Sequence, residues 1–239
     1  MKTLILYIVR HGDPIYDPDS LTPKGLRQAE AVGRRLSNVG ISKIYSSPMI
    51  RAQQTAKPLA EMMHLDINIE DWASEDTAFE EMSLVYNGRK AWYWGLPVEE
   101  IVNNDTIRDY EKWYDLPILQ GRGESIRKGL KRIQDASDKL IANHGYRREG
   151  VLYRIEKPND DRIAMFCHEG FGKAWVSQIL GIAPHLFSTA FEVTHSGIII
   201  IEFPNTDRGV TRPRCLVWSD TSHIYGERLP MTFANRIYI

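Results

Sequence analysis

Four basic side chains have the types and spacing to bind and transfer an anionic group. Arg10 and His11 follow directly after an apolar run over residues 3–9, Arg51 lies further along the chain, and His168 follows another apolar run. Two guanidinium groups can hold a tetrahedral oxyanion through paired hydrogen bonds. An imidazole can act as a covalent nucleophile while it is neutral, and neighbouring guanidinium groups favour its neutral form. These residues predict a phosphoryl group as the ligand.

Each of these basic residues follows a predicted strand. The apolar and turn patterns predict strands over 3–9, 41–46, 66–70, 151–156, 162–167, 191–203 (interrupted near Gly197) and 214–218. Helices are predicted to start at Thr22-Pro23 and at Ser47-Pro48, and others to span 124–143 and 171–180. Strands that alternate with helices indicate an α/β fold. Because ligands bind beyond the carboxyl ends of parallel strands, we expect the four side chains to converge there.

The alternation of strands and helices is interrupted over residues 76–121. This stretch is crowded with tryptophan and tyrosine and has few clean periodic runs. We expect it to form a helical cap inserted over the crevice, within a single domain that spans residues 1–239. We expect most of these aromatic rings to pack in the core and the cap, and some could face the substrate.

Composition limits the class of protein. The 239 residues carry 30 Lys and Arg against 31 Asp and Glu, a formal net charge of -1, so no global field favours nucleic acid or an anionic membrane. The apolar run before Arg10 is too short for a signal-peptide core or a membrane span. The 2 cysteines do not indicate a disulfide framework, which favours a cytoplasmic location. A homodimer is compatible with all of this.

Several sequence blocks together resemble the histidine phosphatase superfamily, which includes the phosphoglycerate mutases, and in particular its branch of small intracellular phosphatases. The blocks are Val9-Arg10-His11-Gly12, then Leu21-Thr22-Pro23-Lys24-Gly25 with Gln28-Ala29, Tyr45-Ser46-Ser47-Pro48-Met49-Ile50-Arg51-Ala52-Gln53-Gln54-Thr55-Ala56, Gly123-Glu124-Ser125, and Cys167-His168-Glu169-Gly170. The resemblance implies a three-layer α/β/α sandwich with a mostly parallel central sheet.

The resemblance also implies roles for individual residues. His11 would be the nucleophile that forms a phosphohistidine, while Arg10, Arg51 and His168 would hold the phosphoryl oxygens. The family's proton donor is an acidic residue after the third strand, and Glu75 fits that place best, with Asp76 and Glu70 as the nearest rivals. The expected activity is hydrolysis of a small-molecule phosphate ester, with no cofactor and no metal ion.

Two positions depart from the family pattern. Asp13 follows Arg10-His11-Gly12 where Glu or Gln is commoner, and its role is open. Glu169 follows His168 where a small residue is usual, so a negative charge is expected near the phosphate pocket. No spacing indicates a role for His195 or His223.

Three alternatives to the phosphatase stay open at this point. A mutase would return the phosphoryl group to another hydroxyl of its substrate, with the aromatic cap excluding water. A divalent metal could be held by His11 and Asp13 with His168 and Glu169, although the two arginines would oppose a cation. The chain could also bind a phosphorylated ligand without turnover, which the unusual acids Asp13 and Glu169 would suit.

Overall fold

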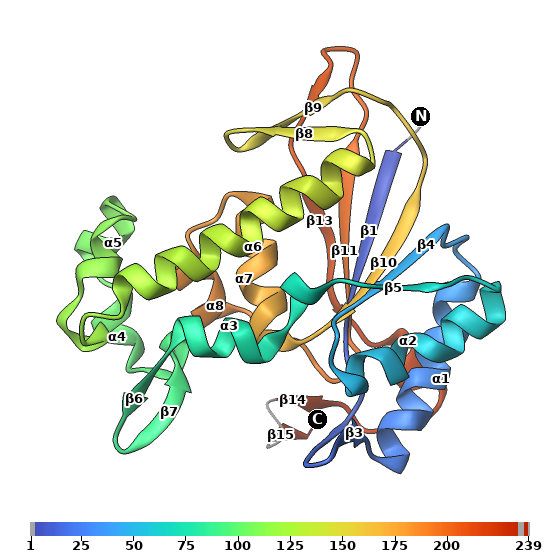
Figure 1. The fold of residues 1–239 in the computed structure, drawn as a ribbon, viewed down its shortest axis with the longest axis horizontal. Helices are drawn as coiled ribbons and strands as arrows, with labels where there is room; N and C mark the ends of the chain where they lie inside the picture. Colours follow the sequence, from blue (N-terminus) through green and yellow to red (C-terminus); the bar gives the residue numbers. More distant parts are fainter. Residues whose placement is uncertain (1–2, 234–236, 239) are drawn as a thin grey trace.

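A twisted six-stranded sheet forms the centre of the computed structural model, which describes residues 3–233 and 237–238 (Figure 1). Its strands, in spatial order, are β13 (Arg214–Asp220), β11 (Ile198–Pro204), β1 (Thr3–Arg10), β10 (Arg162–Cys167), β4 (Lys43–Ser46) and β5 (Ile67–Ile69). The last four run parallel, whereas β11 pairs antiparallel with β1 and with β13. The mostly parallel sheet is therefore confirmed.

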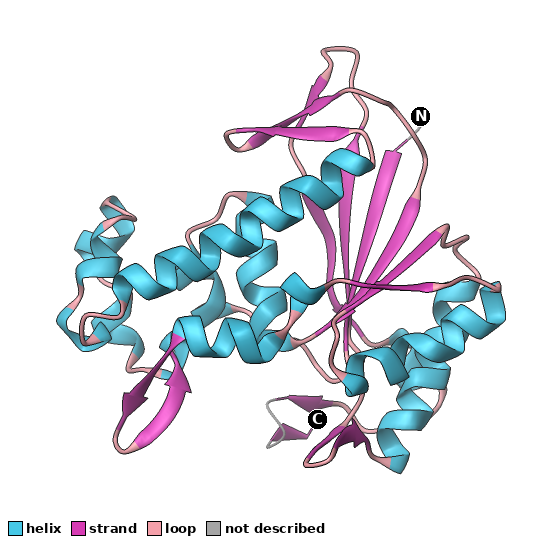
Figure 2. Ribbon diagram, viewed as in Figure 1, coloured by secondary structure: helices cyan, strands magenta, loops and turns pink. Residues whose placement is uncertain are grey.

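Helices cover both faces of this sheet (Figure 2). One layer contains α1 (Pro23–Ser37) and α2 (Ile50–Met63), and the other contains α6 (Gly123–Asn143) and α7 (Glu169–Leu180). Side chains of β1 alternate between the layers, as strand geometry requires. Leu6 and Ile8 belong to the core that includes α6 and α7, while Tyr7 and Val9 belong to the core that includes α1 and α2. This alternation makes the fold a three-layer sandwich.

The stretch between the central strand β5 and helix α6, which contains the residues 76–121 expected to form a cap, extends to one side of the sheet (Figure 1). Its elements are a 3₁₀ turn (Asp71–Ala73), α3 (Glu75–Met82), β6 (Ser83–Tyr86), β7 (Arg89–Trp92), α4 (Val98–Ile101), α5 (Asn104–Arg108) and three further 3₁₀ turns (Tyr93–Gly95, Lys112–Asp115, Pro117–Leu119). The β6–β7 hairpin was not expected, yet Asn87-Gly88 is a strong hairpin signal because both residues adopt positive φ. Tyr93 and Trp113 are fully buried, so part of the aromatic cluster is core.

The remaining elements lie at the edges of the sandwich. They are the hairpin β2 (Pro14–Tyr16) with β3 (Asp19–Leu21), a small sheet of β8 (Tyr146–Glu149), β9 (Leu152–Ile155) and β12 (Val210–Thr211), the short helices α8 (Pro184–Ala190) and α9 (Ser222–Gly226), and the pair β14 (Thr232–Phe233) and β15 (Ile237–Tyr238). None of the helices in the described part of the chain combines the length and apolar character that a membrane crossing needs.

Two predicted boundaries are wrong. Helix α2 begins at Ile50 with Met49 as its N-cap, not at Ser47-Pro48, because Ser47 still donates its backbone N–H to the sheet at Phe166. Residues 191–197 are a loop and not the first half of a strand; Ser196 there has φ 59, and its N–H bonds the His11 carbonyl oxygen. In addition, the strand predicted over 151–156 joins the small sheet, not the central one.

Candidate active site

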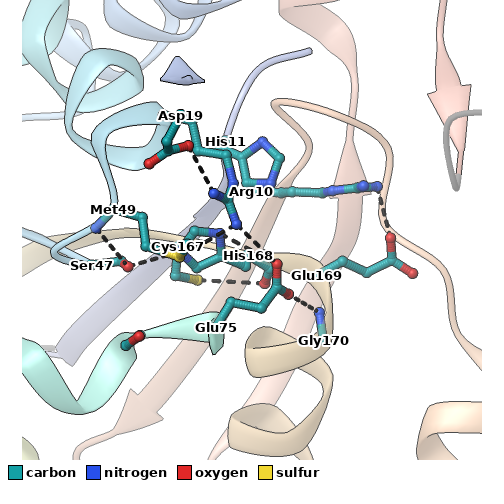
Figure 3. Close-up of polar contacts among 12 residues, drawn as sticks. Arg10, His11, Asp19, Ser47, Met49, Glu75, Cys167, His168, Glu169 and Gly170 are labelled. Carbon is teal, nitrogen blue, oxygen red and sulfur yellow. Dashed lines mark hydrogen bonds and ion pairs between the residues drawn. The ribbon is translucent and has the colours of Figure 1, made fainter. Parts of the chain in front are cut away.

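The carboxyl ends of four neighbouring strands bring the predicted site residues together (Figure 3). His11 follows β1, Arg51 lies in the first turn of α2 after β4, Glu75 begins α3 after β5, and His168 follows β10. The ring centroids of His11 and His168 are 5.2 Å apart, although the residues are far apart in the sequence. The convergence expected from the topology is therefore present in the structure.

His11 is held in one orientation by its own backbone. Its Nδ1 lies 2.7 Å from the Gly12 carbonyl oxygen, which can only accept a hydrogen bond, so we assign the ring proton to Nδ1. The lone pair is then on Nε2. Burial lowers the pKa of His11 well below its usual value, and the charges of His168, Arg10 and Arg51 lower it further. A neutral imidazole with a free Nε2 is what nucleophilic attack requires.

The loop after His11 is packed too tightly for a side chain at position 12. A Cβ on Gly12 would lie 2.6 Å from the Gly25 carbonyl oxygen, so glycine is required there for close backbone approach. The Gly12 N–H donates to Thr55 Oγ1 at 3.0 Å, which ties the loop to α2. The backbone that carries His11 and the loop that follows it are therefore held in place.

Each arginine of the site is paired with acids. Arg10 Nη1 donates to the Val193 carbonyl at 2.5 Å and lies 2.8 Å from Glu169 Oε2. Arg51 Nη1 lies 2.8 Å from Asp19 Oδ1. The Nε atoms of both arginines are buried and have no hydrogen-bond partner among the described residues, so each guanidinium keeps donor capacity for a ligand.

His168 and Glu75 complete the cluster. His168 Nε2 shares a hydrogen bond of 2.7 Å with Ser47 Oγ, and its Nδ1 lies 3.5 Å from Glu75 Oε2. The same Glu75 oxygen lies 3.4 Å from Arg51 Nη2, and its other oxygen accepts the Gly170 N–H at 2.9 Å. These contacts place the Glu75 carboxyl beside the two histidines.

The pKa values of Glu75 and His168 are shifted in opposite directions. Burial raises the pKa of Glu75 above its usual value, although the charges of Arg51 and Arg10 oppose the increase. Burial also lowers the pKa of His168 well below its usual value, and Arg51 and Arg10 add to that effect. A carboxyl whose pKa is raised, beside a histidine whose pKa is lowered, is suited to general acid catalysis.

Three neighbours of the site were not predicted. Asp19 reaches Arg51 from the β2–β3 hairpin, Ser47 contacts His168, and His195 has its ring centroid 5.8 Å from that of His11. A signal for His195 was available, because it lies three residues before β11 (Ile198–Pro204), whose first residues lie beside the end of the antiparallel β1. Ser47 belongs to a motif block, whereas nothing in the sequence near Asp19 indicates its contact with Arg51.

Asp13, whose role the sequence left open, fixes the loop on the other side of His11. Its carboxylate accepts Thr22 Oγ1 at 2.7 Å, lies 3.0 Å from Lys24 Nζ and is 3.4 Å from Nδ1 of the buried His195. Burial alone would raise the pKa of Asp13, but the hydrogen bonds from Thr22 and Lys24 outweigh it and the pKa is lowered. These contacts hold the loop after His11 in place and occupy the oxygens of the Asp13 carboxylate.

The positions of these side chains bear on the alternative that the site holds a divalent metal ion. His11, Glu75 and His168 have potential ligand atoms within 4.8 Å of one another. Asp13 and Glu169, the carboxylates of that alternative, are instead held by the cations Lys24, Arg10 and Lys173. The guanidinium groups at the same site disfavour a divalent cation and favour an anion.

A cavity of about 410 Å³ opens onto His11 and Arg10. This volume suits a small-molecule ligand. The other lining residues are Tyr16, Glu75, Trp92, Trp94, Gly95, Glu169, Gly170 and Glu192. The cap hairpin and its following turn therefore contribute part of the wall.

An α/β sandwich that gathers two histidines and two arginines at the carboxyl edge of its sheet has the positioned cationic and nucleophilic groups that a phosphoryl-transfer protein needs. A model of the histidine phosphatase superfamily (branch 1) matches residues 6–215. The chain belongs to the histidine phosphatase superfamily, as its motif blocks predicted.

Comparisons with individual proteins agree with this assignment. The chain is 25% identical over 188 residues to a protein named "Probable phosphoglycerate mutase GpmB" from Salmonella paratyphi B, a match that covers 75% of this chain and 76% of the relative. It is 41% identical over 71 residues to fructose-2,6-bisphosphatase TIGAR from Xenopus tropicalis, which spans only 26% of each chain.

Solved structures show the same fold. A mycobacterial glucosyl-3-phosphoglycerate phosphatase superposes with a TM-score of 0.60 at 15% identity, covering 92% of this chain and 100% of that one. A phosphoserine phosphatase from Entamoeba histolytica superposes with a TM-score of 0.58 at 17% identity, covering 92% and 99%.

Proposed function

We propose that this protein is a phosphatase that hydrolyses a small phosphate ester through a phosphohistidine on His11, without a metal ion. The observation that carries the proposal is the orientation of His11, whose Nδ1 lies 2.7 Å from the Gly12 carbonyl oxygen, while Nε2 has no hydrogen-bond partner among the described residues. The family supports the same activity. The TIGAR match and the two phosphatases of similar fold are consistent with it.

The first step forms a bond between His11 Nε2 and phosphorus and breaks the bond between phosphorus and the ester oxygen. Glu75, whose pKa is raised by burial, gives its proton to the departing alkoxide. In the second step water attacks the phosphohistidine, Glu75 takes one proton from it, and inorganic phosphate leaves with His11 restored.

The other site residues stabilise charge during both steps. Arg10, Arg51 and the buried His168 would bind the equatorial phosphoryl oxygens. Because these groups are already fixed by Val193, Asp19 and Ser47, little reorganisation is needed when a phosphoryl group enters.

The test is release of inorganic phosphate from a panel of phosphate esters in the presence of a chelator. We expect turnover by the wild-type protein and loss of turnover in His11→Ala. Rapid acid-free quenching followed by mass spectrometry should show one added phosphoryl group on the peptide that contains His11. Unchanged turnover in His11→Ala, or activity that needs an added metal, would refute the proposal.

Phosphoglycerate mutase activity is the second candidate, and the match to GpmB over 75% of this chain favours it. Incubation with 2- or 3-phosphoglycerate distinguishes the two, because a mutase interconverts the isomers while a phosphatase releases phosphate. Tight binding of esters with neither reaction would instead identify a phospho-ligand binding protein.

A further inference from the structure

The loop over residues 192–197 holds Arg10 through its backbone. The Val193 carbonyl oxygen accepts a hydrogen bond from Arg10 Nη1 at 2.5 Å. The Gly197 carbonyl oxygen accepts the backbone N–H of Arg10 at 3.1 Å. The guanidinium and the main chain of Arg10 therefore both depend on the conformation of this loop.

The edge strand β13 holds the same loop from its other side. The indole Nε1–H of Trp218 donates to the Glu192 carbonyl oxygen at 2.6 Å. The Ser219 hydroxyl oxygen accepts the Thr194 N–H at 3.1 Å. Contacts to β13 thus occur at residues that flank Val193, the residue whose carbonyl binds the guanidinium.

The loop also contains a backbone conformation that needs support. Ser196 has φ 59° and Ser219 has φ 56°, values that residues with a side chain seldom adopt. Such conformations persist where the surrounding structure holds them. The buried Ser196 hydroxyl shares a hydrogen bond of 3.0 Å with Nε2 of His223 on α9, and the Ser196 N–H donates to the His11 carbonyl oxygen at 3.0 Å. The His223 ring therefore supports the turn that lies against His11.

The contact with Val193 decides which donors of Arg10 face a phosphoryl group. Nη1 of Arg10 binds the Val193 carbonyl and lies 2.8 Å from Glu169 Oε2, so both of its N–H bonds are engaged (Figure 3). The Nε atom has no hydrogen-bond partner among the described residues, which leaves the Nε side of the planar fork for phosphate. If the loop relaxed, the guanidinium would be held by Glu169 alone, and this fixed orientation would be lost.

We propose that His223 and Ser219 are positioning residues for phosphate binding. They hold the 192–197 loop, and the Val193 carbonyl of this loop sets the orientation of the Arg10 guanidinium. Within the described part of the chain, neither residue lines the active-site cavity, and neither belongs to a motif block. The proposal rests on the proposed function, in which Arg10 binds the phosphoryl oxygens.

The test is the dissociation constant of inorganic phosphate, measured by calorimetry so that no turnover is needed. His223→Leu removes the hydrogen bond to Ser196, whereas His223→Gln can still make it. We expect the Kd of phosphate to rise about three- to tenfold in His223→Leu and to change by less than about twofold in His223→Gln. Ser219→Ala should also raise it about threefold. Tyr225→Leu, at an 87% exposed position of the same helix, is the matched control and should leave the Kd unchanged.

A double-mutant cycle with Arg10→Ala separates positioning of Arg10 from a general loss of structure. Because His223 acts through Arg10, His223→Leu should change the Kd by less than about twofold once Arg10 is alanine. Ser219→Ala is carried through the same cycle, so the test does not depend on the folding of one variant. Urea unfolding identifies the variants that are folded under the binding conditions.

The outcomes distinguish this proposal from the proposed function. If Arg10→Ala leaves phosphate binding unchanged, Arg10 does not bind phosphate and the proposed function fails with the positioning role. If Arg10→Ala weakens binding but His223→Leu has no effect, or weakens it equally in both backgrounds, the positioning role is overturned and the phosphatase stands. Equal weakening by His223→Leu and His223→Gln would also overturn it.

Discussion

Arg10 and Glu169 form an ion pair of 2.8 Å next to His11, with the Glu169 side chain only 16% exposed. Burial alone would raise the pKa of Glu169, but the charge of Arg10, the hydrogen bond with Glu192 and the contact with Lys173 together outweigh it and lower the pKa to about 2, so this acid is ionised near neutral pH. An anionic ligand must therefore share Arg10 with a carboxylate. This relation predicts that Glu169 weakens the binding of phosphate.

The first prediction is that Glu169→Gln lowers the inhibition constant of inorganic phosphate by about tenfold, the effect of removing one nearby negative charge. The measurement is competitive inhibition of ester hydrolysis, with Glu124→Gln, an exposed change on α6, as control. Weaker phosphate inhibition would instead mean that Glu169 acts mainly by holding Arg10 in position.

The second prediction concerns Arg51, which contacts Asp19 at 2.8 Å and Glu75 at 3.4 Å with different nitrogens. A lysine cannot make both contacts, because its charge is a single point and not a planar fork. We expect Arg51→Ala to lower kcat/KM by about 10²- to 10³-fold and Arg51→Lys to recover only part of it. Arg34→Lys, on the exposed face of α1, is the matched control and should leave kcat/KM unchanged.

The third prediction is a bell-shaped pH dependence of kcat/KM. His11 must be neutral, and its pKa lies well below 6.5, so activity should fall only when the pH drops well below that value. Glu75 must be protonated, and its pKa lies above 4.5, so activity should fall as the pH rises through that raised pKa. Glu75→Gln should lower kcat/KM by about 10²- to 10⁴-fold and remove the part of the alkaline fall that Glu75 causes.

Both proteins are compared on one substrate, because ionisation of the ester phosphate then affects both profiles equally. If Glu75→Gln keeps the same alkaline fall as the wild type, Glu75 is not the proton donor. Asp76 and Glu70, the rivals expected from the sequence, would then be tested in the same way.

The sequence was most informative where chemistry and backbone geometry require particular residues. Arg10 and His11 lie at the end of one strand and Arg51 in the first helical turn after another, all inside motif blocks, so their convergence followed from the rule that parallel strands share one carboxyl edge. His168 was found by the same rule. Glu75 was expected only from its position after the third strand, and the structure places it against Gly170 and Arg51.

Other contacts could not be predicted because they depend on how distant segments pack. Asp19 reaches Arg51 from a hairpin that looks like an ordinary turn-rich loop in the sequence. The loop 191–197 was predicted as strand because it adjoins an apolar run, yet it supplies the carbonyl of Val193 to Arg10 and the ring of His195 beside His11. The local sequence pattern indicates which residues are apolar, but it does not predict the turn at residues 191–197 that carries these groups.

The fourth prediction is that the free energy of unfolding decreases as the pH is lowered below neutrality. Burial lowers the pKa of five histidines, namely His11, His168, His185, His195 and His223. Each is neutral in the folded state and takes up a proton on unfolding once the pH is below its ordinary value of about 6.5. The unfolded state then binds more protons, so the free energy of unfolding decreases as the pH falls through that value.

Each of these histidines can contribute up to about 1.4 kcal/mol per pH unit. Urea unfolding at pH 7.5 and at lower pH would measure the slope. His223→Gln removes one titrating group outside the catalytic cluster, where His223 Nε2 bonds Ser196 Oγ at 3.0 Å, and should make the slope shallower. A free energy of unfolding that is constant or increases towards pH 5 would contradict this account.

The last prediction compares two glycines on α7. A Cβ on Gly170 would lie 2.4 Å from the Trp92 ring, whereas a Cβ on Gly172 would meet only Cys167 Sγ at 4.0 Å. Gly170→Ala must displace the indole from the cavity wall, so we expect a loss of about 1–3 kcal/mol in the free energy of unfolding and a reduced kcat/KM. Gly172→Ala has room and raises helix propensity, so it should be neutral or stabilise by up to about 1 kcal/mol. Urea unfolding and steady-state kinetics of both variants check this, and equal behaviour of the two would show that Trp92 does not pack against the start of α7.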